Sequence, residues 1–368
     1  MKDSFKNFNS GRVMFFLLAT ITVILFAAVL KITTSVVLPF TVSVLLALVT
    51  TPLVRFMVKF HIPRVISIFL VLILLMGGVS FIGIIIYSSG RTILNLYPKY
   101  EARLTEIYIW LALFFELPYD EHLSIFDNLW GQLGVRSRVR VMTIDFTNAF
   151  LGFLKDAVMV AIFMVFLLFE AVFFKEKLDK AFEGRAVKIK KMGSDIITKV
   201  TRYLSIKFLI SVANGLIMGL GLKIIGVEFA VVWGIIQFIG NFIPNFGSIA
   251  VGVSATAFSL VQFWPNPTPV VATALLVLGM NMVLSYFIEP KITGDNLGLS
   301  PMVILLSLLA WGWLWGFTGL IIAVPMMVIT KIICENIPML EPLAILLGSR
   351  KAVFNFKSGG EGEDETEL

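Results

Sequence analysis

Residues 289–301 read EPKITGDNLGLSP, a charged stretch with two prolines and two glycines that separates two long apolar runs. The run before it, 270–288, reads VVATALLVLGMNMVLSYFI, and the run after it covers 302–333. A run of about 20 apolar residues is long enough to cross a bilayer core of roughly 30 Å. The stretch is therefore expected to be a polar link between membrane-embedded segments, with its charges at the membrane boundary.

Both ends of this link carry signals for helix boundaries. Pro290 is expected to stop the preceding helix, because proline lacks the backbone N–H that a helix interior needs. Gly294 permits a turn that other residues resist. Ser300 followed by Pro301 predicts the start of the next helix, with the serine as its N-cap and the proline at its first position.

The composition of the whole chain agrees with membrane insertion. Hydrophobic residues make up 58% of it and charged residues 15%, against about 45–50% and about 25% in soluble domains. The net charge of +6 is modest, so no nucleic-acid partner is indicated. The chain has one cysteine, Cys334, which excludes an internal disulfide. No pattern indicates a metal site, a cofactor or catalytic residues, so an enzyme is not expected.

Loop charges predict how the spans are oriented. Basic residues are concentrated in residues 1–12, 55–64 and 175–207, which places these regions and both termini on the cytoplasmic side. The segment 88–148 is then extracytoplasmic. Further spans are expected at 13–30, 35–54, 65–87, about 150–174 and 204–222.

This topology divides the chain into five parts. We expect N-terminal spans (1–87), an extracytoplasmic helical subdomain (88–148), a span followed by a basic amphipathic helix on the membrane surface (149–203), a transport domain (204–345) and a disordered cytoplasmic tail (346–368). Plain positive-inside topology is the alternative explanation for the basic loop.

The transport domain contains apolar segments that are too short to span. Residues 228–242 and 247–263 are separated by IPNFG, and residues 300–315 and 317–333 meet at Gly316. Arms of 15 to 17 residues cover roughly 22–26 Å, less than the bilayer core. Each pair is either a re-entrant hairpin or two short tilted spans.

The two pairs are related by one constant offset along the chain. At this offset three glycines coincide with three others: Gly226 with Gly298, Gly240 with Gly312, and Gly247 with Gly319. The predicted topology gives the two repeats opposite orientations. The expected fold is an all-α integral membrane protein, a multi-span helical bundle with two broken hairpins in an inverted repeat. Interrupted helices in inverted repeats indicate a transporter with its site near the hairpin tips.

Polar residues in spans are candidate functional residues because their burial is costly. Candidates for substrate binding are Asn214, Asn241, Pro244, Asn245, Gly247, Asn281, Gly316, Thr318 and Gly319, with Gln237 nearby. Amide side chains both donate and accept hydrogen bonds, which favours a neutral, polyol-like solute over a bare cation. The alternative is that these side chains bond neighbouring helices to one another.

Two carboxylates are candidates for ion coupling. Glu289 closes the last full span, and Glu170 lies near the cytoplasmic end of an earlier one. The alternative is that each is an interfacial carboxylate paired with a lysine, such as Lys291 or Lys175.

Three motifs carry a resemblance to a known family: NFIPNFGS (241–248), EPKITGDNLGLSP (289–301) and GFTGLIIAVP (316–325). Over about residues 10–345 the chain resembles the autoinducer-2 exporter family of bacterial membrane proteins. The resemblance implies a secondary exporter in the bacterial cytoplasmic membrane, pentameric, with a moving hairpin-bearing unit in each protomer. Asn245 and Phe246 depart from the family pattern, which bears on the substrate more than on the fold.

Three functions follow as hypotheses. The first is a secondary transporter that exports a small polar metabolite such as autoinducer-2, by ion-coupled or facilitated alternating access. The second is a sodium or lithium/proton antiporter on the same fold. The third is a non-transporting membrane scaffold. Membrane lipid is an expected partner in all three.

Overall fold

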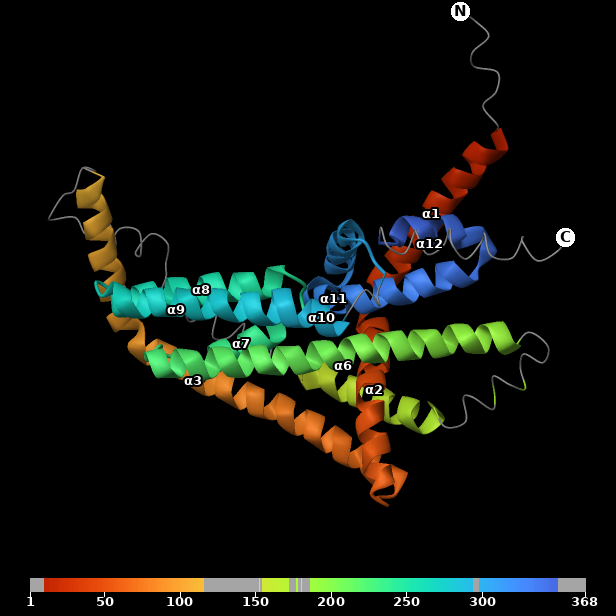
Figure 1. The fold of residues 1–368 in the computed structure, drawn as a ribbon, viewed down its shortest axis with the longest axis horizontal. Coiled ribbons are helices and arrows are strands. Elements are labelled where there is room, and N and C mark those ends of the chain that lie inside the picture. Colours follow the sequence, from red (N-terminus) through yellow and green to blue (C-terminus); the bar gives the residue numbers. More distant parts are fainter. Residues whose placement is uncertain are drawn as a thin grey trace, which may run out of the picture. The chain divides into compact units, whose positions relative to one another are not determined.

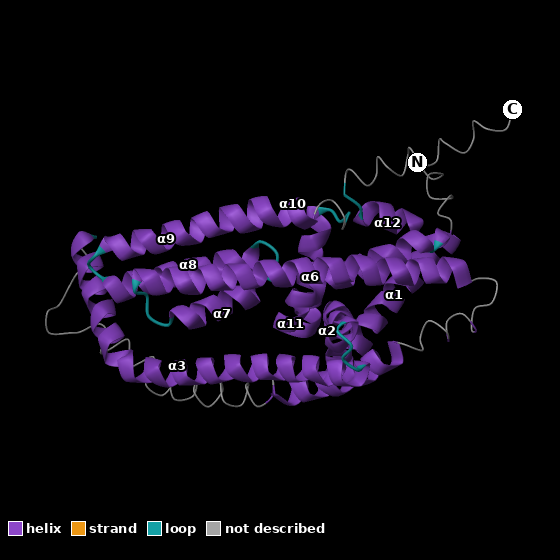
Figure 2. Ribbon diagram, turned by 60° about the horizontal axis from the view of Figure 1, so that its bottom comes forward, coloured by secondary structure: helices purple, strands orange, loops and turns teal. Residues whose placement is uncertain are grey.

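The computed structural model describes residues 10–115, 152, 154–171, 177, 180, 186–293 and 298–349. Within these ranges the chain forms helices and no strand (Figure 2). They fall into two compact units, which are described separately below. Unit 1 comprises Met1–Ala47, Met159–Ile196 and Gly298–Leu368, and unit 2 comprises Leu48–Val158 and Ile197–Leu297. Expectations for residues 116–151, for most of 172–185, for 294–297 and for the tail after 349 lie outside the described residues.

Six helices of the described chain are long and apolar enough to cross a membrane. They are Thr34–Lys59, Arg64–Gly90, Lys190–Ile225, Phe246–Phe263, Pro267–Ile288 and Pro301–Asn336. The helical, membrane-spanning character predicted from composition is confirmed. The N-terminal helix α1 (Ser10–Ile32) precedes α2 (Thr34–Lys59).

Two helices are longer than their expected spans. Helix α3 (Arg64–Phe114) has 51 residues and continues well past residue 87. Helix α6 (Ala186–Ile225) has 40 residues and joins the basic segment to the following span without a break. At about 1.5 Å per residue these helices are roughly 76 and 60 Å long. Because no proline lies between residues 186 and 225, nothing in the backbone forces the boundary that was expected near residue 204.

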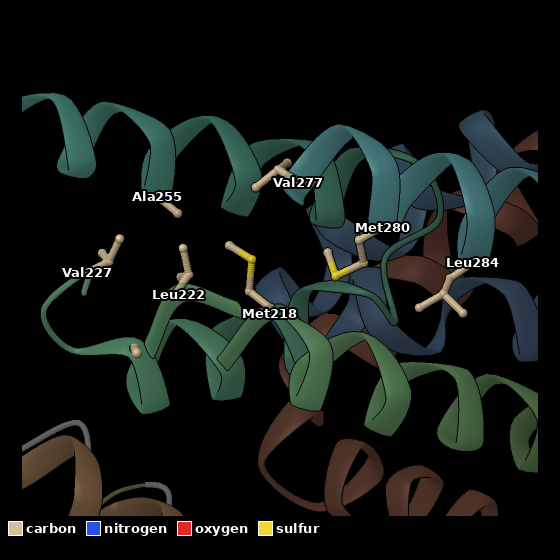
Figure 3. Close-up of a cluster of buried hydrophobic side chains, with 8 residues drawn as sticks. Met218, Leu222, Val227, Ala255, Val277, Met280 and Leu284 are labelled. Carbon is tan, nitrogen blue, oxygen red and sulfur yellow. The ribbon is translucent and has the colours of Figure 1, made fainter. Parts of the chain in front are cut away.

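The core of unit 2 lies between α6 and the helices α8 (Phe246–Phe263) and α9 (Pro267–Met280). Helices α8 and α9 run side by side (Figure 1). Met218 and Leu222 of α6 point toward Val277 and Met280 of the α9 segment (Figure 3). All four side chains are buried, and burial of each contributes about 1.5–3 kcal/mol in water-soluble proteins.

The helical chain that begins with α9 continues past Pro290, contrary to the expectation from the sequence. A π-helical segment, η1 (Asn281–Ile288), follows α9, and α10 (Glu289–Thr293) follows η1. The Glu289 N–H bonds the carbonyl of Leu284, five residues earlier. The α-helical ladder is thus already interrupted where Pro290 lacks its donor, and helical structure is described as far as Thr293.

A polar clasp joins α3 to the turn after α6. The Lys99 ammonium lies 2.5 Å from the Glu228 carboxylate, and the Tyr100 hydroxyl donates to the same group. Partial burial acts to raise the pKa of Glu228, but the bonds from Lys99 and Tyr100 outweigh this and lower it. Gln262 of α8 completes the clasp, accepting from the Glu228 N–H and donating to the Gly226 carbonyl.

Unit 1 is organised around α11 (Pro301–Asn336), which α1 contacts. The predicted N-cap is confirmed, because the Ser300 hydroxyl accepts from the Val303 N–H at 3.2 Å. The 3₁₀ turn η3 (Pro338–Leu340) and helix α12 (Glu341–Leu347) follow α11. The Gly298 carbonyl accepts from the Lys331 ammonium at 2.9 Å and from the Ser349 N–H at 2.7 Å. The end of the EPKITGDNLGLSP link is therefore anchored within unit 1.

Candidate functional site: a buried polar seam

The first interrupted segment packs as tightly as backbones allow. Helix α7 (Ala230–Gly240) and α8 are joined by a turn at residues 241–245. A Cβ added to Gly247 would lie 1.7 Å from the Gly240 carbonyl oxygen. Only glycine fits at that distance. The break lies where the sequence predicted it.

Helix α11 contains the second break. Trp315 and Gly316 have non-helical backbone angles, and Gly316 has φ +61°. A Cβ added to Gly319 would lie 1.9 Å from the Trp311 carbonyl oxygen. The predicted break at Gly316 is confirmed, and a glycine again allows the close backbone approach beside it.

Asn241 bonds the first break to its neighbours. Its side-chain nitrogen donates to the Ser211 hydroxyl of α6 at 2.9 Å, and its side-chain oxygen accepts from the Ser248 hydroxyl of α8 at 2.9 Å. All three side chains are buried. Asn241 thus makes the interhelical hydrogen bonds that were the alternative to solute binding.

Two contacts fix how α6 lies against the α9–η1–α10 segment. A Cβ added to Gly221 would lie 2.5 Å from Leu276, and the Lys207 ammonium lies 2.5 Å from the Glu289 carboxylate. Lys207 precedes Gly221 along α6, whereas its partner Glu289 follows Leu276 along the α9–η1–α10 segment. Helix α6 and this segment therefore run antiparallel. Asn214 lies two helical turns from each α6 contact and on the same face. It therefore faces η1 near Asn281.

Gln237 faces the same part of α6 from α7. On one side of it, a Cβ added to Gly234 would lie 2.7 Å from the Gly215 carbonyl oxygen. On its other side, Asn241 bonds Ser211. Gln237 lies between these contacts with helical spacing, so it belongs to the face of α7 that packs against α6, and its side chain is fully buried.

Four polar side chains of unit 2 carry buried atoms that have no hydrogen-bond partner in the described protein. The atoms are both polar atoms of the Asn214 side chain, both of the Gln237 side chain, the side-chain oxygen of Asn281 and the hydroxyl of Ser285. An unpaired buried polar group costs about 1–3 kcal/mol. A hydrogen-bonding guest, water or solute, would remove that cost.

We name this region the polar seam. It consists of Lys207, Ser211, Asn214, Gln237, Asn241, Ser248, Asn281, Ser285 and Glu289. One wall is the π-helical segment η1, and such segments are frequent at functional sites. All nine residues belong to unit 2.

The polar seam contains some of the site residues that were predicted from the sequence. Asn214, Asn241, Asn281 and Glu289 belong to it, as does Gln237. Pro244 and Gly247 belong to the first break, and the exposed Asn245 lies there with φ +62°. Gly316, Thr318 and Gly319 belong to the break in unit 1.

The two coupling candidates differ sharply in environment. Glu289 binds Lys207, whose side chain is only 4% exposed, in place of the expected Lys291. Glu170 lies in unit 1, where its half-exposed carboxylate pairs with Lys177; Lys175 lies outside the described residues. Sequence patterns did not indicate Lys207, Ser211, Ser248 or Ser285. The seven-residue spacing from Lys207 to Asn214, which places both residues on one face of a helix, could have identified Lys207.

We expect the Lys207→Met variant to lose about 1–3 kcal/mol of stability, because it leaves the partly buried Glu289 carboxylate without its partner. The double variant Lys207→Met/Glu289→Leu should recover most of that loss. Thermal unfolding of the purified protein, followed by tryptophan fluorescence, measures both effects. Lys291→Met is the matched control, because Lys291 is exposed. Equal loss in the control and in Lys207→Met would contradict the buried pair.

Comparisons with known proteins identify the family of the chain. The model of the AI-2E family transporter matches residues 16–339. A Borreliella burgdorferi protein, provisionally named a transport protein, is 36% identical over 210 residues, 56% of this chain and 58% of its own length. YhhT of Escherichia coli (strain K12) is 29% identical over 307 residues, 82% of this chain and 85% of its own.

A further relative has a name that specifies a solute. The AI-2 transport protein TqsA of Escherichia coli (strain K12) is 28% identical over 307 residues, which cover 82% of this chain and 86% of that protein. The family match covers most of the chain and includes both helix breaks and the whole polar seam. The chain is an integral membrane protein and belongs to the AI-2E family of transporters.

Proposed function

We propose that the protein is a secondary transporter that moves a small, neutral, hydrogen-bonding solute through the polar seam. The observation that carries this proposal is the group of unpartnered polar atoms on Asn214, Gln237, Asn281 and Ser285. Each of these six atoms would cost about 1–3 kcal/mol if nothing paired with it, and a hydrogen-bonding solute would remove that cost. Membership of a family of transporters supports the same conclusion.

The chemistry of the seam favours a neutral solute over a bare cation. Amide and hydroxyl groups supply both donors and acceptors. The only carboxylate of the seam, Glu289, is already neutralised by Lys207, so a sodium or lithium ion would have to displace an ammonium. Because TqsA is named for the transport of AI-2, we propose a solute of that class. The exporting direction that we propose rests on the resemblance of the three motifs to an exporter family. Glu289 is the proposed coupling group, because it is the carboxylate of the seam and binds Lys207.

The proposed cycle uses both helix breaks as an inverted repeat. Supporting it, the close glycine approach recurs at Gly247 and Gly319, which coincide at the constant offset of the repeat. Gly226 and Gly298, at the same offset, both have positive φ. We propose that the seam of unit 2 and the break of α11 alternate in opening to the two sides of the membrane. We propose that the protein forms a homo-oligomer, pentameric as the resemblance implies, and that its subunit contacts keep the remaining parts of each protomer fixed.

The proposed orientation places both termini and residue 190 in the cytoplasm of a bacterial cell. In a Cys334→Ala background, we expect Lys190→Cys to resist a membrane-impermeant maleimide applied to intact cells. Asp120→Cys should react under the same conditions. Permeabilised cells, in which both positions should react, provide the control. The reverse pattern in intact cells would overturn the proposed topology.

Flux into proteoliposomes tests the function itself. The parent protein is expected to move AI-2 across the bilayer and to respond to an imposed proton or sodium gradient. Protein-free liposomes give the background. Sodium flux without AI-2 flux would identify an antiporter, and the absence of both would favour a scaffold.

A further inference from the structure

A cavity of unit 2 lies between α3, α6 and α7, and none of the residues that line it belongs to the polar seam. Its volume is about 600 Å³, within the range of small-molecule sites. Residues Phe81, Ile82 and Ile85 of α3 form one wall, and residues of α6 and α7 form the other. Lys223 is the one charged residue among those that line it. We call this cavity the α3–α6–α7 groove.

The groove opens onto an apolar surface. Phe81, Leu216, Leu220 and Val231 stand at it with more than half of their area exposed. Such exposure is costly in water and acceptable in hydrocarbon. The groove therefore faces the lipid phase, where an apolar chain is the guest available at highest concentration.

The floor of the groove is made by glycines. Gly215 and Gly219 of α6 and Gly234 of α7 line it, and the two backbones approach closely at this crossing. Small residues allow such close packing between membrane helices. They also leave a trough beside the crossing, because no side chain fills the space above them.

The length of the groove matches one leaflet of a bilayer. Its α6 residues run from Val212 to Lys223, a path of roughly 16 Å along the helix axis. One leaflet supplies about half of the roughly 30 Å hydrocarbon core. Lys223 lies at the end of this path, three residues before the turn at Gly226 that follows α6. Its ammonium is therefore placed where a phosphate would lie.

We propose that the α3–α6–α7 groove binds a phospholipid, with one acyl chain along α6 and the headgroup phosphate against Lys223. The occupant is a phospholipid because the groove pairs an apolar trough one leaflet long with a single cation at its end. This site is independent of the solute seam and does not rest on the transport proposal.

Photolabelling of the full-length protein in liposomes tests the site. The probe is phosphatidylglycerol with a diazirine in the middle of one acyl chain, and mass spectrometry locates the adducts. Adducts are expected on Ile82, Ile85 and Leu216 in preference to Leu209, which is exposed on α6 outside the groove. Even labelling of all exposed apolar residues would overturn the proposal.

Substitutions in the groove distinguish binding of the acyl chain from binding of the lipid headgroup. Ile82→Trp fills the groove and should remove most of the adducts, whereas Leu209→Trp should leave them. Lys223→Gln should lower labelling about fivefold, as expected for one lost basic contact near an anionic lipid. Labelling by a diazirine fatty acid but not by the phospholipid would contradict the proposal. So would cross-linking of the groove to a second copy of the chain in place of lipid.

Discussion

Replacing Gly247 by alanine is expected to reduce transport at least tenfold. The added methyl group would lie 1.7 Å from the Gly240 carbonyl oxygen, so the turn between α7 and α8 would have to open. Overpacking of a tight core typically costs about 1–3 kcal/mol, and a rigid backbone oxygen places this substitution at the upper end. Solute flux per correctly inserted protein measures the effect.

Two further alanine variants make this test specific. Gly319→Ala meets the Trp311 carbonyl oxygen at 1.9 Å, so it should impair transport to a similar extent if both breaks take part. Gly279→Ala is the matched control, because an added Cβ there meets no atom within 4 Å. Parent-like flux in the Gly247 and Gly319 variants would show that neither close approach matters for transport.

The double variant Asn214→Leu/Gln237→Leu is expected to lose transport while keeping or gaining stability. Each substitution removes polar atoms that have no protein partner, so no intramolecular hydrogen bond is lost. If the solute pairs with these atoms, each lost contact costs about 1–3 kcal/mol, and together they should lower flux at least tenfold. Flux and thermal unfolding are measured on the same preparations.

Asn241→Leu gives the contrasting result that separates binding from packing. Its amide bonds Ser211 and Ser248, so its loss should reduce stability and transport together. If Asn214→Leu/Gln237→Leu is destabilised in the same way as Asn241→Leu, the unpartnered atoms have a structural role and the proposed site is wrong.

Local patterns in the sequence predicted local features of the structure. The break at Gly316 and the cap at Ser300 depend on residues next to them in the chain, and both were predicted correctly. The short arms around IPNFG likewise predicted the ends of α7 and α8 within a few residues. Asn214 and Asn281 were recognised because polar side chains are rare within apolar runs.

Features that depend on distant residues could not be predicted in this way. Lys207 and Glu289 are far apart in the chain, so their pairing appears only when α6 lies against α10. The role of Asn241 depends on partners in α6 and α8, which the sequence of its own segment does not reveal. The helix continues through Pro290 because η1 had already changed the hydrogen-bond register, and no residue type signals that change.

Water access to the seam tests the central claim most directly, and it does not depend on knowing the solute. In a Cys334→Ala background, Asn281→Cys places a thiol in the seam, and Leu278→Cys places one on the exposed apolar surface of α9. A small, charged methanethiosulfonate reagent reacts only where water reaches. A seam that opens during a transport cycle predicts that Asn281→Cys reacts in membranes while Leu278→Cys does not. An Asn281→Cys thiol as inert as that of Leu278→Cys would contradict transport through the seam.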